Sequence, residues 1–233
     1  MIKRLAIIPA RGGSKRIPNK NVKLFCGKPM ISYILNSAQK SMLFDTIHVS
    51  TDKGEIKSIV ENMGFPIDFM RSPALADDFT PLMPVLKFVT DSYASRGQLF
   101  DQVWLLMACA PLIGFSDLQQ AAKLFEQSED CNSLLAVTEY PVPIEWAFSL
   151  EKDGRLKPVQ PGMFSVRSQD LEKKYFEAGI FAVYSSSIVQ ASEGAGSDAD
   201  SVGFVLPKRK AIDIDDEADW ATAEALYRER NSY

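Results

Sequence analysis

A glycine-containing segment near the N-terminus carries four cations within ten residues. Residues 9–21 read PARGGSKRIPNKN and directly follow the apolar residues 5–8. Two adjacent glycines let the backbone turn tightly and approach a ligand closely. A cleft lined with cations and backbone N–H groups binds polyphosphate. The segment has neither a P-loop motif nor a G-x-G-x-x-G fingerprint. We therefore predict a phosphate-binding loop of another kind; the alternative is a solvated charged loop.

Two carboxylates near the C-terminus form a second candidate site. Asp213 and Asp215 flank Ile214 on a segment that we expect to be extended, and residues i and i+2 of a strand point to one face. Two carboxylates on one face suit Mg²⁺, which takes a few carboxylates together with phosphates and water. Acidic residues also stabilise the start of a helix, which explains Asp215 and Asp216 more easily than Asp213. Both roles can coexist.

The remaining candidates for chemistry are few. The single histidine, His48, falls in an expected strand and is predicted to be a core or edge residue. The three cysteines, Cys26, Cys109 and Cys131, lie far apart without a C-x-x-C pair, so we expect free thiols in a reducing compartment. The longest uncharged apolar stretch, residues 103–115, is too short to span a bilayer. The expected location is cytoplasmic, with no membrane contact.

Composition limits the class of protein. The chain has 233 residues, of which 46% are hydrophobic and 24% charged, as in ordinary globular proteins. This excludes wholesale disorder. The net charge of −4 argues against sequence-independent binding of nucleic acid. The length fits a single α/β domain over residues 1–233.

Short apolar runs alternate with helical patterns over the first two thirds of the chain. Such βαβα repetition predicts a doubly wound, mostly parallel Rossmann-like sheet. We expect Asp52 and Ser116 to lie at helix starts. The predicted strands are residues 5–8, 47–50, 67–70, 102–107 and 133–138, and the predicted helices are residues 29–40, 52–63, 81–93 and 117–127.

The alternation of strand and helix patterns stops near residue 140, where prolines become frequent. Residues 147–156 predict a β-hairpin, and strands at 179–184 and 202–206 precede a closing helix at 217–230. We interpret residues 141–176 as a small β/α arm inserted near the C-terminal third, because Trp146, Phe148 and Phe164 need burial. The alternative is a long surface loop.

Residues 9–21 resemble the loop of the cytidylyltransferases that activate nonulosonic acids and related keto-sugar acids with CTP. Three further motifs share the resemblance, which covers almost the whole chain in order: Ser50-Thr51-Asp52, RSPALADD at 71–78 and IDID at 212–215. The resemblance implies the nucleotidyltransferase type of the doubly wound fold. It also implies attack by the anomeric hydroxyl of a sugar acid on the α-phosphate of CTP, with Mg²⁺ as cofactor.

A finer resemblance points to the branch that uses pseudaminic acid, a nine-carbon sugar acid. QDLE at 169–172, Tyr175 and Ala178-Gly179 match that branch. The sialic acid branch has Arg-Pro-Asn-Gly and Gln-Pro-Thr-Ser-Pro-Leu-Arg where this chain has FEAG at 176–179 and MACAPLI at 107–113. Open alternatives are N-acetylneuraminic, legionaminic or deoxyoctulosonic acid and, in another class, a catalytically inactive nucleotide-binding regulator.

The resemblance also implies roles for individual residues. Arg71 has an alternative role in a surface ion pair with Asp77 or Asp78, and the sugar residues could instead form an ordinary polar helix start. A homodimer formed through the arm is the implied assembly. The implied roles are catalytic for Arg11, Lys15 and Lys20; nucleotide-binding for Ala10, Arg11, Gly12, Gly13, Ser14, Asn21, Arg71 and Ala110; sugar-binding for Gln169, Asp170 and Tyr175; and metal-binding for Asp213 and Asp215.

Overall fold

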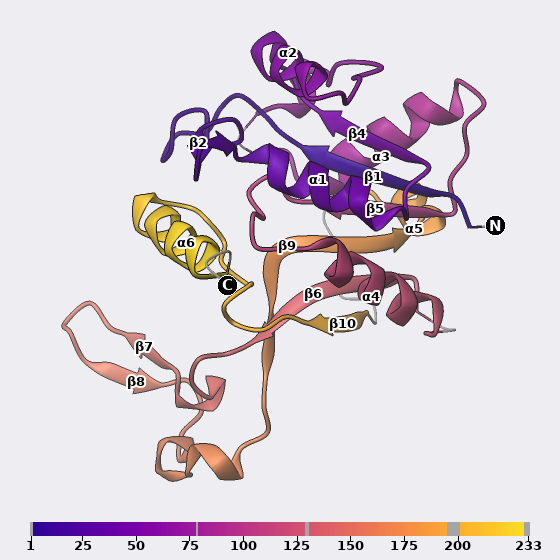
Figure 1. The fold of residues 1–233 in the computed structure, drawn as a ribbon. Coiled ribbons are helices and arrows are strands. Elements are labelled where there is room, and N and C mark those ends of the chain that lie inside the picture. Colours follow the sequence, from indigo (N-terminus) through magenta and orange to yellow (C-terminus); the bar gives the residue numbers. More distant parts are fainter. Residues whose placement is uncertain (1, 78, 129–130, 195–200, 231–233) are drawn as a thin grey trace.

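A six-stranded sheet with the order β10-β6-β9-β5-β1-β4 forms the centre of the protein (Figure 1). The computed structural model describes residues 2–77, 79–128, 131–194 and 201–230. Within this sheet the strands are parallel except β9, which is antiparallel to β5 and β6. This confirms the mostly parallel sheet. The strands are β1 (Arg4–Pro9), β4 (Thr46–Ser50), β5 (Gln102–Leu106), β6 (Ser133–Glu139), β9 (Tyr175–Ser185) and β10 (Val202–Val205).

Helices cover both faces of the sheet, which confirms the doubly wound α/β class. The side chains of β1 alternate between two apolar clusters: Ala6 and Ile8 pack with α1, α2 and α4, whereas Leu5 and Ile7 pack with α3 and α5. A strand buried on both faces needs an uninterrupted apolar run. The helices are α1 (Ile31–Ser41), α2 (Gly54–Asn62), α3 (Leu82–Ala94), α4 (Phe115–Glu126), α5 (Ser186–Ala191) and α6 (Glu217–Arg230).

A third cluster holds the C-terminal helix against the region that follows β1. Phe25 belongs to a small hairpin of β2 (Leu24–Phe25) and β3 (Lys28–Pro29). Its ring contacts Tyr33, Trp220 and Tyr227 edge-on, at centroid distances of 5.3 to 5.7 Å. Ile214 is fully buried in the same cluster. The packing therefore brings residues 9–21 and 212–216 together.

Three local predictions are wrong. Residues 67–70 form no strand; Phe69 instead stacks on His48 of β4 at 4.4 Å between ring centroids. Asp52 does not cap α2, whose N-cap is Lys53, without a side-chain bond. Helix α4 begins after Gly114 rather than Ser116, and Asp117 accepts a hydrogen bond from the Gly114 N–H at 2.9 Å.

The predicted hairpin of the arm is confirmed as β7 (Phe148–Leu150) paired with β8 (Leu156–Pro158). The arm projects away from the sheet below β6 and β9 (Figure 1). Three short 3₁₀ turns, Ile144–Trp146, Met163–Ser165 and Ser168–Asp170, complete it. Phe164 contacts Phe148 and Trp146 at 5.3 and 6.1 Å yet stays 64% exposed. The aromatic residues of the arm are thus only partly buried within this chain.

Among the described residues, no helix is both long enough and apolar enough to cross a membrane.

His48 is a buried core residue, as predicted. The Tyr93 hydroxyl donates to Asp68 Oδ2 at 2.6 Å and lies 3.1 Å from His48 Nδ1. Since the hydroxyl proton points to Asp68, His48 must donate through Nδ1–H as a neutral ring. Its Nε2 is buried and has no hydrogen-bond partner among the described residues. Burial lowers the pKa of His48 from 6.5 to about 4.

We expect His48 to make the protein less stable in mild acid. The unfolded chain takes up the proton near pH 6.5 but the native chain only near pH 4, so stability falls as the pH falls through this window. His48→Asn retains a donor toward Tyr93 without titrating. Between about pH 7.5 and 5.5, the free energy of unfolding should fall by about 1 kcal/mol more in the natural protein than in His48→Asn. Parallel urea titrations measure this, and identical pH dependence of the two proteins would contradict it.

Candidate active site

A cavity of about 480 Å³ lies at the carboxyl ends of β1 and β5, where Pro9 and Met107 line it. Ligands of doubly wound sheets bind at this edge. The predicted residues Arg11, Gly13, Ser14, Lys15, Lys20, Asn21, Arg71 and Asp215 all line it, together with Pro9, Arg16, Ile17, Leu75, Asp77, Thr80, Leu82, Val85 and Met107. The structure thus brings the N-terminal loop, the segment after residue 71 and one of the two predicted metal ligands to one cavity.

Ser50, at the end of β4, holds two walls of the cavity. Its carbonyl oxygen accepts from the Ala10 N–H at 2.9 Å and from Arg71 Nη2 at 2.6 Å. Its hydroxyl accepts from Arg71 Nε at 3.0 Å, and the Arg71 N–H donates to the Thr51 carbonyl at 2.8 Å. The loop after β1 and the segment after residue 71 are therefore fixed to the same strand end.

Arg71 is 5% exposed, so its alternative role in a surface ion pair with Asp77 is wrong. The other predicted partner, Asp78, lies outside the described residues. Ser50 satisfies Nε and Nη2. The third nitrogen, Nη1, donates to no group in the described part of the chain. Burial lowers the pKa of Arg71 to about 10, which leaves the side chain charged at neutral pH. Arg71 therefore presents a cationic donor to the cavity.

Asp52 is a site residue that the sequence analysis misplaced. Its Oδ1 accepts from the Gly12 N–H at 3.1 Å, which ties the loop to the β4–α2 connection. A Cβ on Gly12 would lie 2.2 Å from Cγ of Lys53, so the missing side chain lets Lys53 pass over the loop. The position of Asp52 just after β4 was the available signal, because carboxyl ends of neighbouring parallel strands meet at one edge.

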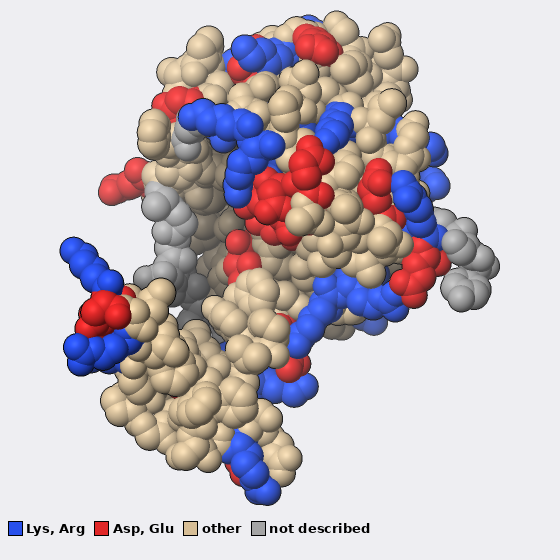
Figure 2. Space-filling view, turned by 90° about the vertical axis from the view of Figure 1, so that its left-hand side faces the viewer, with Lys and Arg blue, Asp and Glu red and all other residues tan. Residues whose placement is uncertain are grey.

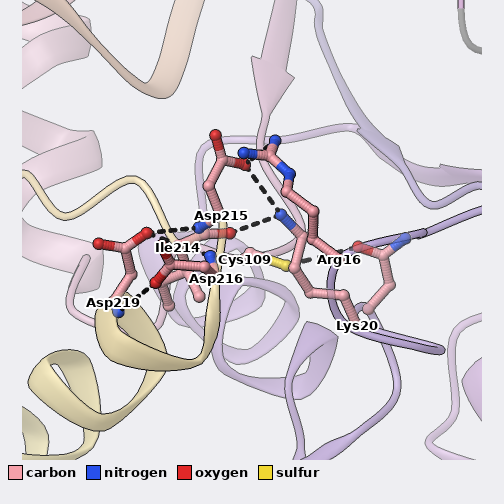
Figure 3. A network of polar contacts seen from close by, with 8 residues as sticks. Arg16, Lys20, Cys109, Ile214, Asp215, Asp216 and Asp219 are labelled. Carbon is pink, nitrogen blue, oxygen red and sulfur yellow. Dashed lines mark hydrogen bonds and ion pairs between the residues drawn. The ribbon is translucent and has the colours of Figure 1, made fainter.

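The cations around the cavity are paired with oxygens of other segments (Figure 3). Arg16 contacts Asp215 at 2.9 Å, and Lys20 donates to the Ile214 carbonyl at 2.5 Å with Asp215 Oδ1 3.5 Å away. Arg11 Nη1 donates to the Asp77 carbonyl at 2.6 Å. On the face that Figure 2 shows, basic and acidic side chains lie directly beside each other. For Arg16 the sequence pattern alone indicates no role.

Capping of α6 is done by residues other than Asp215. Asp216 Oδ1 accepts from the N–H groups of Ala218 and Asp219 at 2.9 and 3.0 Å, and Asp219 Oδ2 accepts from the N–H groups of Asp215 and Asp216. This is a capping box. Capping by the Asp215 side chain is therefore wrong, and that carboxylate points to Arg16 and Lys20 instead (Figure 3).

Asp213 and Asp215 have the chemistry to hold a divalent cation. The Asp213 carboxylate accepts no hydrogen bond from the described residues, and partial burial together with the neighbouring Asp215 raises its pKa. A divalent cation would relieve the repulsion between the two carboxylates. The described residues contain no group of three or more possible ligands. Mg²⁺ fits such a pair, because it completes its shell with phosphate oxygens and water.

Some predicted contact residues have other positions. Ala110 is 1% exposed in the apolar core and does not line the cavity. Ala10 and Gly12 contribute through backbone bonds. Gln169, Asp170 and Tyr175 lie on the arm and do not line the cavity of their own chain.

Asn21 lines the cavity, but its amide serves the loop. Nδ2 donates to the Arg11 carbonyl at 3.0 Å, and Oδ1 accepts from Cys109 Sγ at 3.5 Å. Burial raises the pKa of Cys109 to about 12, so this thiol stays protonated and is no nucleophile.

The doubly wound sheet and its cation-lined cavity at the strand ends define a nucleotide-binding α/β enzyme. The sequence model of the cytidylyltransferase family matches residues 5–152. The chain belongs to this family, which confirms the predicted class of enzyme.

Three similar proteins extend this result. A pseudaminic acid cytidylyltransferase of Campylobacter jejuni is 37% identical over 97% of each chain. A CMP-N,N'-diacetyllegionaminic acid synthase of Legionella pneumophila is 29% identical over 95% of each chain. The solved structure of CMP:2-keto-3-deoxy-manno-octonic acid synthetase, complexed with CTP, has a TM-score of 0.68 at 17% identity and covers 98% of this chain and 99% of its own. The last likeness shows the fold alone.

Asp52→Ala should weaken CTP binding without unfolding the protein. The change leaves the Gly12 N–H without its charged acceptor, and such a bond contributes about 1.5–3 kcal/mol. We expect the Kd for CTP, measured by calorimetry, to rise about tenfold or more. Asp52→Asn, which keeps an acceptor oxygen, should retain most of the affinity. CTP binding by Asp52→Ala at the natural affinity would show that the contact does not position the loop.

Proposed function

We propose that this chain transfers CMP from CTP to the anomeric hydroxyl of a nonulosonic acid, with pseudaminic acid as the preferred acceptor. The observation that carries the proposal is the cation-lined cavity at the ends of β1 and β5. The similarity to the Campylobacter jejuni enzyme over nearly the whole chain supports the choice of acceptor.

Arg11, Lys15 and Lys20 are the proposed catalytic cations. Nucleotidyl transfer depends on positioning and on neutralising phosphate charge more than on covalent chemistry. Arg11 and Lys20 already point to oxygens at the cavity, and a triphosphate offers them acceptors of higher charge. Arg16 joins this set, because its partner Asp215 lies at the same cavity.

Arg71 is the proposed reader of the cytosine base. Cytosine presents O2 and N3 as acceptors, whereas N3 of uracil is a donor. A guanidinium has only donors, and none of the described residues accepts a hydrogen bond from Nη1 of Arg71. A donor facing the cavity thus favours cytosine over uracil. Asn21 acts indirectly by holding the Arg11 carbonyl.

Asp213 and Asp215 are the proposed ligands of Mg²⁺. When bound, the ion would neutralise phosphate charge and lower the pKa of a hydroxyl bound to it. Asp215 would exchange Arg16 for the ion, which leaves that guanidinium for the phosphates. The Asp213 carboxylate accepts no hydrogen bond from the described residues that the ion would have to replace.

The acceptor preference has partial support in the pocket wall. Met107 lines the cavity where the sialic acid branch has Gln. The neighbouring Ala108, Ala110 and Ile113 are at most 3% exposed and lie in the core. They do not form the apolar wall that their replacement of polar residues suggests.

A panel of sugar acids with CTP and Mg²⁺ tests the proposal. We expect kcat/KM for pseudaminic acid to exceed that for N-acetylneuraminic acid at least tenfold, or by about 1.4 kcal/mol. Pyrophosphate release with any acceptor separates an enzyme from an inactive nucleotide-binding regulator. A preference for N-acetylneuraminic, legionaminic or deoxyoctulosonic acid would refute the choice of acceptor and leave the enzyme class standing. UTP in place of CTP is the control for the base.

We also propose a homodimer in which the arm of one copy completes the sugar site of the other. Gln169, Asp170 and Tyr175 do not line the cavity of their own chain. On the face in Figure 2 the middle of the arm is largely uncharged, with basic and acidic side chains at its ends. An exposed apolar patch of this kind marks an interface. Its exposed side chains include Val142, Leu150, Leu156, Val159 and Phe164.

The three free thiols support a cytosolic location.

Mixing two inactive variants tests this arrangement. Lys15→Ala damages the phosphate site and Tyr175→Ala the sugar site. If each site combines residues of two copies, a mixed dimer has one intact site. Random exchange of subunits should then restore about a quarter of the natural activity. No activity after exchange, or a monomer in light scattering, would refute the shared site.

A further inference from the structure

The Asp213 carboxylate lies in close contact with the place that a side chain at Gly179 of strand β9 would take. Gly179 has a left-handed φ of +64°, and a Cβ built on it would lie 3.1 Å from Asp213 Oδ2 and 3.3 Å from Asp213 Cγ. Only about one in ten real Cβ contacts is that close. Gly179 lies where the pairing of β9 with β6 shifts register.

Other glycines with positive φ lack this feature. Gly64, with φ +88°, has nothing within 4 Å of a built Cβ, and the same is true of Gly27 and Gly154. At those positions glycine serves the turn alone. Gly179 also donates its N–H to Glu177 Oε1 at 3.0 Å, which holds the backbone in the conformation that faces Asp213.

We propose that Gly179 is a positioning residue for Asp213 and, through it, for the divalent cation at Asp213 and Asp215. The proposal rests on the proposed function of these carboxylates. Mg²⁺ demands near-ideal octahedral geometry, so a shift of a few tenths of an ångström in one ligand weakens its binding. Without a side chain, Gly179 lets the carboxylate lie against the β9 backbone, where no described donor competes for its oxygens.

The simpler alternative is that glycine is needed at position 179 only because the backbone is left-handed there. A matched pair of variants separates the two roles. Gly179→Ala and Gly64→Ala each place alanine in a left-handed conformation, so each should lower the Tm by about 2–8 °C. Only Gly179→Ala also pushes on Asp213.

The measurement is the affinity for CTP by calorimetry, with saturating MgCl₂ and with EDTA, in the absence of any sugar acid. MgCl₂ should raise the affinity of the natural protein for CTP, and we expect this increase to be at least tenfold smaller in Gly179→Ala. The affinity of Gly179→Ala in EDTA should stay within about twofold of that of the natural protein. Gly64→Ala should match the natural protein in both buffers. An unchanged magnesium gain in Gly179→Ala, or an equal loss in both buffers, would overturn the proposal.

Asp213→Asn separates this proposal from the metal site itself. If Asp213→Asn keeps the full magnesium gain, the proposed metal site is wrong. If Asp213→Asn loses the gain but Gly179→Ala does not, only the positioning role is wrong. Adding Gly179→Ala to Asp213→Asn should cause no further loss, because residues that act through each other are not additive.

Failure to fold is also decisive. Should Gly179→Ala not fold, Gly179→Asn carries the same test, because asparagine tolerates a left-handed backbone better and still brings a Cβ. If neither variant folds, the backbone alone requires glycine, and the positioning role is overturned.

Discussion

A buried guanidinium at the carboxyl end of β4 sets the shape of the site. A charge removed from water is costly unless hydrogen bonds satisfy it, and Arg71 meets this requirement through the carbonyl and hydroxyl of Ser50. The same carbonyl accepts from the Ala10 N–H. One strand end therefore fixes the start of the phosphate loop and leaves one Arg71 nitrogen for a ligand. The sheet supplies this geometry because β1 and β4 are parallel and end together.

The second constraint is the contact between the two ends of the chain. Burial of Ile214 and the rings around Phe25 hold α6 against the N-terminal loop. This packing places Asp215 beside Arg16 and Lys20. The cations therefore lie at the cavity before a triphosphate and a divalent cation arrive, which is a form of electrostatic preorganisation. Binding of the divalent cation would open the pair of Arg16 with Asp215.

The sequence predicted best what is encoded locally. The apolar run of β1, the glycines and cations after it and the arm hairpin each depend on neighbouring residues. Contacts between distant segments were missed: Asp52 bonds to Gly12 across forty positions, and Arg16 contacts Asp215 from the opposite end of the chain. Residues 67–70 have the composition of a strand, but they form none, and Phe69 stacks on the ring of His48 instead. The sequence does not show which cavity Gln169, Asp170 and Tyr175 face, because these residues lie on an arm that projects away from the sheet (Figure 1).

A crystal structure of the protein with CTP and Mg²⁺ tests the central claim most directly. The account predicts the cytosine within hydrogen-bonding distance of Arg71 Nη1, the triphosphate against Arg11 and Lys15, and Arg16 released from Asp215. Binding of CTP outside the cavity at the ends of β1 and β5 would contradict it. So would a bound triphosphate with Arg16 still paired with Asp215 and no cation beside Asp213.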